Sequence, residues 1–395
     1  MVNIGACLSL AGYNDLCCDL IIQADLLNKV MDNEILLMHL LPNLFHSSYF
    51  IYVLSQVTNY IKQKEGQNTL VLTIIHILLL SDRERYNKEE LLSIERLLLS
   101  EVEWTEYEDA NFLKGVSYYN LANYYREIFE FNLAIKNYVQ AKRYHERYKF
   151  EAYYYHDLAS IFFDIGKYRW ASLAYQKTID LEGELIAKAL LGDALMFQGY
   201  YEKARMAFDH YLSESKENND YEWHLKLICL STFIDHGWAK IQKRDTKTAK
   251  KLVEKGRYEE ALEKDFLLDI AWYNIGIIHN ESSRYLESTM SFLMAALLSP
   301  QNIEAWVDAT GCCLSGKFES SKDLLYYIVN CAYVYNNEAY IRELLTNSNF
   351  EDLSLNNYIE KIIDEIIVKS DHNINRNKII RSFNGSSWDE APYFM

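Results

Sequence analysis

A large residue followed by a small one recurs along this chain, and the first three such pairs stand 158 − 121 = 37 and 191 − 158 = 33 residues apart. This recurrence constrains the fold more than any other feature. The recurring pairs are Leu121-Ala122, Leu158-Ala159, Leu191-Gly192 and Ile275-Gly276. Twelve residues after each pair comes a second small residue, and an aromatic residue follows four positions later. These second positions are Ala134 with Tyr138, Ala171 with Tyr175, Ala204 with Phe208, and Ser288 with Phe292. A period of this length indicates a chain built of stacked repeats.

The pattern within each unit predicts a pair of antiparallel helices. A small residue on the first helix lets the second helix cross close to its backbone, and the aromatic residue fills the space beside it. Gly166 and Gly199 each stand five residues before the alanine of the second helix, where the first helix must stop. The chain has only 3 Pro and 14 Gly, and half of its residues are hydrophobic, which favours long helices.

These positions resemble the tetratricopeptide repeat, whose unit is about 34 residues long. The clearest stretch runs from Trp272 to Trp306, and the resemblance covers Phe112–Tyr211 and Gly256–Leu325. It implies an all-α fold, an α-solenoid of antiparallel helix pairs that follows a right-handed superhelix. The chain departs from the family pattern at Phe129, which occupies a turn-glycine position, and at Ser288, which replaces an alanine.

Four segments follow from this reading. Residues 1–105 are predicted to be divergent helical repeats, 106–212 three clear repeats, 213–369 irregular helices followed by further repeats and a closing helix, and 370–395 a polar tail. Two registers stay open before Trp272, because Trp238 lies one repeat length upstream while Gly256, Tyr258 and Ala261 predict a shortened repeat. The tail carries Trp388, and docking on the solenoid or on a partner are both open.

The net charge, the cysteines and the apolar runs of the chain indicate its partners and its cellular compartment. The net charge of −16 repels phosphate backbones, so nucleic acid is disfavoured as the principal partner. The seven cysteines are odd in number and lack a C-x-x-C motif, which indicates reduced thiols in the cytoplasm. No signal peptide or membrane span is predicted, since the apolar run 70–80 is too short to cross a bilayer. Homo-oligomerisation through the exposed ends of the solenoid stays open.

No catalytic, cofactor or metal motif stands out. Gly311, Gly316 and Lys317 satisfy GxxxxGK, but Phe318 replaces the Ser or Thr that ligates magnesium in a phosphate loop. The ten histidines form no H-E-x-x-H motif and no cluster with cysteine. We therefore expect no enzyme activity, no cofactor and no metal.

The family resemblance implies that the first helices of successive repeats line a concave groove. The candidate groove residues are Tyr119, Asn123, Arg126, Tyr153, His156, Phe163, Asp193, Phe197, Tyr273 and Asn280. This aromatic lining with scattered polar groups suits a protein or peptide partner. The family branch that clamps a C-terminal carboxylate is disfavoured, because Tyr119 stands where the first lysine of the clamp belongs. For each position the competing interpretation is ordinary packing or solvation.

One basic stretch opposes the acidic charge of the chain. It contains Lys243, Arg244, Lys247, Lys250 and Lys251 in close succession. A solvated helix face is the plain interpretation, and a site for a carboxylate or phosphate group is the sharper one.

The leading hypothesis is a non-catalytic protein- or peptide-binding scaffold that acts as an adaptor or regulatory subunit. A peptide-responsive regulatory switch, an accessory or sensor subunit of a bacterial defence or toxin system, and an enzyme with an unrecognised site around residues 213–250 are the alternatives.

Overall fold

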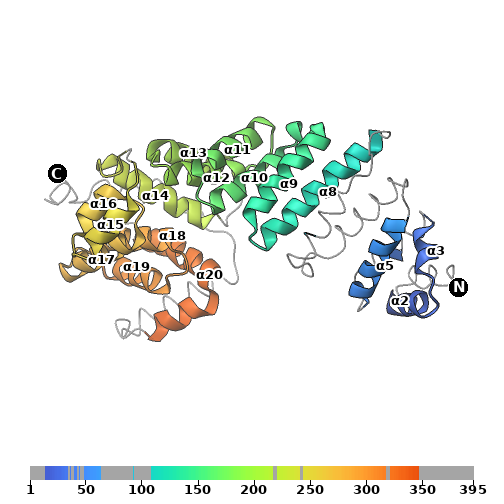
Figure 1. The fold of residues 1–395 in the computed structure, drawn as a ribbon. Coiled ribbons are helices and arrows are strands. Elements are labelled where there is room, and N and C mark those ends of the chain that lie inside the picture. The colour runs from blue at the N-terminus through green and yellow to red at the C-terminus, as the bar shows by residue number, and fades with distance from the viewer. Residues whose placement is uncertain are drawn as a thin grey trace. The chain divides into compact units, whose positions relative to one another are not determined.

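The computed structural model describes residues 14–33, 49–63, 108–216, 220–240, 243–316 and 321–346, together with the single positions 36, 40, 41, 44 and 92. Within these ranges every regular element is helical (Figure 1). The chain divides into two compact units, residues 1–165 and 166–395. That division falls inside the predicted block 106–212, and the predicted tail 370–395 lies outside the described residues.

The first unit contains an N-terminal group of helices, the first clear repeat and the first helix of the second. Its helices are α2 (Asn14–Gln23), α3 (Leu27–Met31), α5 (Phe50–Gln63), α8 (Glu108–Glu127), α9 (Phe131–Tyr144), the 3-10 helix η2 (Glu146–Phe150) and α10 (Ala152–Asp164). The longest helix, α8, packs along α9 as the antiparallel pair that the sequence predicts. Much of the predicted segment 1–105 lies outside the described residues.

The second unit continues with ten helices among its described residues. They are α11 (Tyr168–Asp180), α12 (Ile186–Phe197), α13 (Tyr201–Glu214), α14 (Tyr221–Asp235), α15 (Thr246–Val253), α16 (Tyr258–Lys264), α17 (Asp269–Glu281), α18 (Tyr285–Leu298), α19 (Ile303–Gly316) and α20 (Ser321–Thr346). Consecutive helices pack together in α12–α13, α15–α16, α17–α18 and α19–α20. A non-helical residue, Asn337, interrupts α20.

The turn between the two helices of a repeat has one conformation, whatever residue occupies it. Gly166, Gly199 and Gly256 have φ values of 73°, 85° and 71°. Phe129 and Ser283 occupy the equivalent position in their repeats and have φ values of 61° and 58°. This left-handed conformation costs a residue with a side chain more than it costs glycine. The fold therefore imposes the turn, and glycine is only its preferred occupant.

The close crossing of the two helices is confirmed at the two glycines of the large–small pairs. A Cβ atom added to Gly192 would lie 2.6 Å from the ring of Phe208, and one added to Gly276 would lie 2.7 Å from the ring of Phe292. Each aromatic ring thus fills the space that the missing side chain leaves.

The two registers that the sequence left open before Trp272 are decided in favour of the shortened repeat. The helices α15 and α16 form a short hairpin through Gly256, and Ala261 is buried in it. Trp238 follows the end of α14 and lies in no helix.

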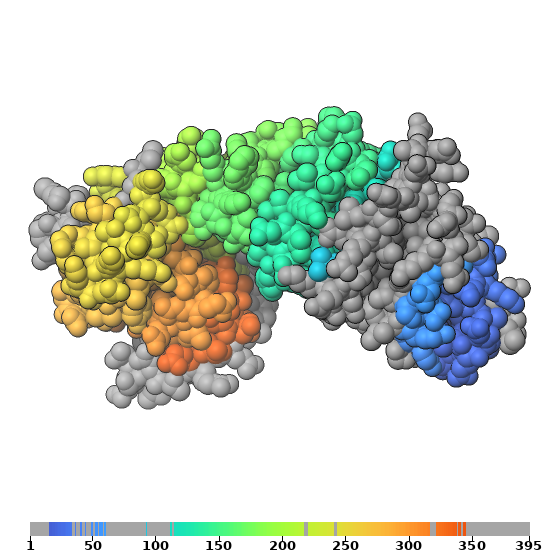
Figure 2. Space-filling view, in the orientation of Figure 1, coloured from blue at the N-terminus to red at the C-terminus, as the bar shows by residue number. Residues whose placement is uncertain are grey.

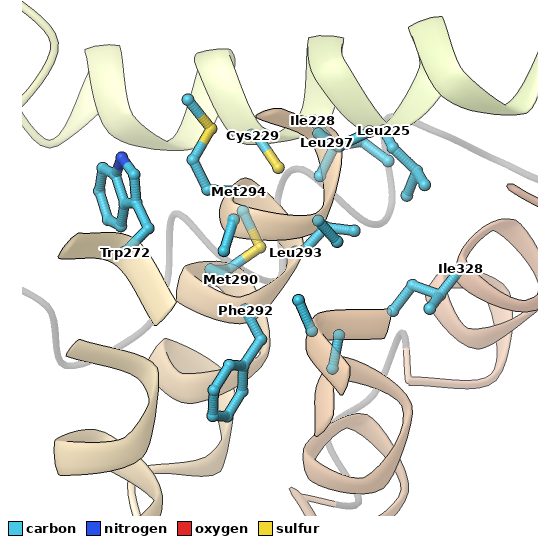
Figure 3. Packing of buried hydrophobic residues seen from close by; sticks show 14 of the residues in the cluster. Leu225, Ile228, Cys229, Trp272, Met290, Phe292, Leu293, Met294, Leu297 and Ile328 are labelled. Carbon is cyan, nitrogen blue, oxygen red and sulfur yellow. The ribbon is translucent and has the colours of Figure 1, made fainter. Parts of the chain in front are cut away.

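The second unit departs from a simple stack, in which each repeat contacts only its neighbours. Every residue of α18 from Glu287 to Leu297 is buried, because α14, α17 and α19 all pack against this helix (Figure 3). The helix α14 also contacts α20, although Glu222 and Tyr335, which join them, are 113 residues apart. One continuous apolar core therefore runs from α12 to α20.

Candidate partner-binding surface

Three of the predicted groove positions lie on one face of α8, and they meet side chains of α10. Tyr119, Asn123 and Arg126 follow one another at helical spacing, as do Tyr153 and Asp157 on α10. The Tyr119 hydroxyl donates a hydrogen bond to Asp157 Oδ2, and the Arg126 guanidinium pairs with Asp157 Oδ1 at 2.9 Å. We call these five residues the tyrosine–aspartate surface.

Aromatic rings surround the buried side of this surface. The Tyr119 ring stacks on Tyr148 with centroids 5.1 Å apart, and it meets the rings of Tyr138 and Tyr153 edge to face at 5.4 and 5.6 Å. The Tyr138 hydroxyl in turn donates a hydrogen bond to Asn123 Oδ1. Because these rings hold one another, the surface is fixed before any partner arrives.

The electrostatic environment of the surface keeps Tyr119 and Arg126 protonated. Burial raises the pKa of Tyr119, and the neighbouring carboxylate of Asp157 raises it further. Burial acts against the charge on Arg126, but its attraction to Asp157 raises the pKa of the guanidinium overall. Tyr119 therefore remains a hydrogen-bond donor at neutral pH, and Arg126 remains a cation.

The remaining predicted positions of the first unit lie along α10. Tyr153 is 49% exposed, whereas the Tyr119 ring is half-buried. His156 and Phe163 are half-buried. Tyr153 is thus the aromatic ring of the surface that has most area left to bury against a partner.

Two predicted positions of the second unit are occupied by contacts within the chain. The prediction that Asp193 faces a partner requires correction, since this residue is buried and its Oδ1 pairs with Lys226 Nζ at 2.7 Å. Tyr273 donates a hydrogen bond to Asp308 Oδ2 at 2.9 Å. Both bridges link the first helix of one repeat to the first helix of the next. Asp193 is buried by its bridge, whereas Tyr273 remains half-buried.

The other two predicted positions of this unit differ in their surroundings. The ring of Phe197 stacks on Tyr168 with centroids 4.9 Å apart, and the Arg244 guanidinium lies 5.7 Å from its centre. Asn280 is exposed at the end of α17. Their role in binding stays a prediction.

A tyrosine-to-aspartate bridge occurs at the same repeat position in both units. Tyr119 and Tyr273 each stand two residues before the large–small pair, and each donates to an aspartate of the following repeat. The acceptors, Asp157 and Asp308, were not among the predicted residues. Asp157 follows Tyr153 by one helical turn, and this spacing was the signal that could have identified it.

In the basic stretch the arginine is engaged in an ion pair, whereas the lysines are exposed. Arg244 donates to both carboxylate oxygens of the fully buried Asp265, at 2.7 and 3.1 Å, so its assignment to an anion site requires correction. The four predicted lysines are exposed, and they are Lys243, Lys247, Lys250 and Lys251.

Three features of the described residues bear on catalytic chemistry. They contain no group of three His, Cys, Asp or Glu side chains that could hold a metal ion. Burial raises the pKa of the Cys312 thiol to about 11, which disfavours the nucleophilic thiolate. Gly311 and Gly316 belong to α19, whereas a phosphate loop must be a loop, and Lys317 lies outside the described residues.

No helix among the described residues is both long and apolar enough to span a bilayer.

Comparisons with known proteins give structural similarity alone. No protein-family model matches the chain, and no curated protein matches it. Among solved structures it is similar to YrrB, a TPR protein with an unusual peptide-binding site, at 16% identity and a TM-score of 0.31 over 51% of this chain and 95% of that one. It is also similar to the TPR domain of P58(IPK), at 14% identity and a TM-score of 0.29 over 93% and 98% of the two chains.

The resemblance to tetratricopeptide-repeat proteins is confirmed by the helix pairs themselves. They have the left-handed turn and the small-to-aromatic crossing that the sequence predicts. The superhelical path stays a prediction.

Proposed function

We propose that this chain is a non-catalytic scaffold that binds a protein or peptide through the tyrosine–aspartate surface on α8 and α10. The observation that carries the proposal is the half-exposed ring of Tyr153, held against Tyr119 and beside the Arg126–Asp157 ion pair. Aromatic and arginine side chains contribute most of the binding energy at protein interfaces. Here both kinds occur together on a preorganised face.

The geometry suits a partner segment with an apolar anchor and hydrogen-bonding groups. Tyr153 offers ring area, while Arg126 is 36% exposed at its side chain and keeps N–H groups that can still donate. Because Arg126 is already held by Asp157, its side chain loses little further entropy when a partner binds there. Specificity in this proposal comes from Asn123 and Arg126, which follow Tyr119 at helical spacing on α8.

The finer role is an adaptor or regulatory subunit in the cytoplasm. A preorganised binding surface of this kind suits a protein that brings other molecules together or changes their conformation. Four cysteines of the second unit are free and buried, and they are Cys229, Cys312, Cys313 and Cys331. Free thiols of this kind are typical of a reducing compartment.

Affinity capture from the native host, read by mass spectrometry, tests the proposal. The bait is the full chain, and it is compared with Tyr153→Ala, which removes the exposed ring and leaves the Tyr119–Asp157 bridge in place. Loss of this anchor should weaken binding of a genuine partner about tenfold or more. Tyr119→Ala is a poorer choice, because it also breaks a hydrogen bond within the fold.

Trp170→Ala is the matched control. Trp170 is 59% exposed on α11 and lies outside the tyrosine–aspartate surface, so its removal should leave the captured proteins unchanged. Capture of the same stoichiometric partner by the parent chain and the Tyr153→Ala variant would place the binding site elsewhere. Absence of any stoichiometric partner would argue against a scaffold.

A further inference from the structure

The hairpin of α15 and α16 carries a concentration of exposed positive charge on an otherwise acidic chain. We call five exposed side chains the lysine patch, and they are Lys243, Lys247, Lys250, Lys251 and Lys255. They follow one another closely in the sequence, while the chain as a whole has a net charge of −16. Figure 2 shows this hairpin, in yellow, at the surface of the second unit.

The two arginines of the same stretch are engaged, and the lysines are not. Arg244 binds the buried carboxylate of Asp265, and Arg257 pairs with Glu260 on the first turn of α16. Within the described part of the chain, none of the patch lysines takes part in an ion pair. The arginines therefore build the hairpin, and the lysines are left to face the solvent.

The hairpin presents these lysines on a fixed platform. Asp245 caps α15 by accepting hydrogen bonds from the backbone N–H and the hydroxyl of Thr248, at 3.1 and 2.7 Å. The backbone N–H of Asp245 donates to the carbonyl of Lys264, which ties the start of α15 to the end of α16. Asp265 also accepts from the Thr246 hydroxyl at 2.6 Å. Charges held in a fixed arrangement cost a partner less entropy than charges on a mobile tail.

We propose that the lysine patch binds an acidic segment of a protein partner, rich in Asp and Glu. This inference rests on the proposed scaffold function and assigns it a second contact surface, formed by α15 and separate from the tyrosine–aspartate surface. Lysine ammonium groups act as point charges and favour carboxylates through attraction rather than through the two-pronged geometry of arginine. An acidic segment is attracted by the patch and repelled by the net charge of the rest of the chain, which directs it to α15.

The size of the patch favours a short peptide segment over a nucleic acid. The eight residues of α15 span about 12 Å, which is close to the Debye length of about 8–10 Å at physiological salt. A peptide of a few residues can lie wholly within the field of the lysines. A nucleic-acid duplex extends well beyond it and meets the negative charge of the rest of the chain.

The apolar side of α15 also disfavours a membrane surface. Helices that lie on a bilayer bury an apolar face among the lipids. In α15 that face is already used, because Ala249 is buried and Leu252 and Val253 pack against the core of the second unit. Lysines without a free apolar face give only a weak attraction to lipid headgroups.

Fluorescence anisotropy with a short labelled peptide of alternating Glu and Ser tests the proposal on the full chain. At an ionic strength of about 0.15 M, we expect saturable binding that weakens as salt is added. A variant with Lys243, Lys247, Lys250 and Lys251 all changed to Gln should lose about tenfold or more in affinity. These side chains are exposed, so the variant should retain the far-UV circular dichroism of the parent chain.

The control variant carries the same change at four exposed lysines elsewhere in the second unit. These are Lys167, Lys177, Lys216 and Lys322. It has the same net charge as the patch variant and should bind the peptide within about twofold of the parent chain, since all five lysines of the patch are retained.

Three results would overturn the inference. The first is that the acidic peptide does not bind, and the second is that the patch and control variants lose affinity for it equally. The third is that a DNA duplex or phosphatidylserine vesicles bind the patch more tightly than the peptide does. Tyr153→Ala should leave binding of this peptide unchanged, because it alters none of the patch lysines and lies in the other compact unit. Failure of the peptide experiment therefore leaves the proposed function of the tyrosine–aspartate surface standing.

Discussion

Replacing Lys226 by methionine is expected to destabilise the second unit more than other single changes at a charged side chain. Lys226 lies on α14 with only 8% of its side chain exposed, and it pairs with Asp193 of α12 and Glu222 of its own helix. Trp223 Nε1 donates to the same Asp193, and the Tyr335 hydroxyl of α20 donates to Glu222. One cation thus holds two carboxylates that join three helices.

The expected loss of stability arises because the substitution leaves two carboxylates without a cation. Burial acts to lower the pKa of Lys226, but the two carboxylates raise it well above its ordinary value, so the ammonium group is charged in the folded chain. Methionine fills most of the lysine volume, yet it leaves two carboxylates without their cation. Removing one partner from a buried ion pair costs about 3–5 kcal/mol. For a unit of this size, that corresponds to a melting temperature lower by roughly 6–20 °C.

Thermal and urea unfolding, followed by circular dichroism at pH 7, measure this loss. Lys250→Met on the exposed face of α15 is the matched control, and its stability should stay within about 0.5 kcal/mol of the parent chain. A triple variant that also carries Asp193→Asn and Glu222→Gln should recover much of the loss, because no uncompensated charge remains. If Lys226→Met is as stable as the Lys250→Met control, the ion-pair network does not stabilise the unit.

The pH dependence of Lys226→Met supplies a second check. Burial already raises the pKa of Asp193, and loss of the cation raises it further. A carboxyl group whose folded-state pKa lies above its unfolded value stabilises the fold fully below the unfolded value, and this contribution is lost as pH rises through the folded value. The deficit of the variant should therefore shrink as pH falls from 7 toward 4. A constant deficit over this range would refute the electrostatic explanation.

Three further outcomes are expected. Gly276→Ala should cost about 1–3 kcal/mol in urea unfolding, because its Cβ would meet the ring of Phe292, and adding Phe292→Leu should restore part of that loss. Arg244→Met should lower the melting temperature through the unpaired, buried Asp265, whereas Arg244→Lys should retain part of the stability. Burial lowers the pKa of His279 to about 4, so the stability of the folded chain should fall by up to about 3 kcal/mol as the pH drops from about 6.5 to 4. His279→Gln should remove that portion of the pH dependence.

The helix pairs could be predicted from the sequence because their determinants are local. The small residue, the aromatic residue and the turn lie close together along the chain, and the helical period fixes which of them share a face. Even the departure at Phe129 did not mislead, because the packing of α8 on α9 imposes the turn on a residue other than glycine.

The candidate surface was predictable only in part. The family resemblance assigned Tyr119, Arg126 and Tyr153 to the first helices of two successive repeats. The structure brings Tyr119 and Arg126 together at Asp157, and the ring of Tyr153 meets that of Tyr119. The sequence could not show which polar groups are already paired, since a hydrogen bond between repeats depends on the distance between two first helices. Asp193 illustrates the difficulty, because its partner Lys226 stands 33 residues away without a motif to mark it.

By itself, the sequence determined the helical repeat, the position of its turns and the acidic charge with one basic stretch. The tertiary structure decided the rest. It buried α18 from every side, joined α14 to α20, and separated the arginines that build the α15 hairpin from the lysines that remain exposed. The physical reason is one of range, since helix formation and capping act over a few residues. Burial and ion pairing depend on which helices the folded chain brings into contact.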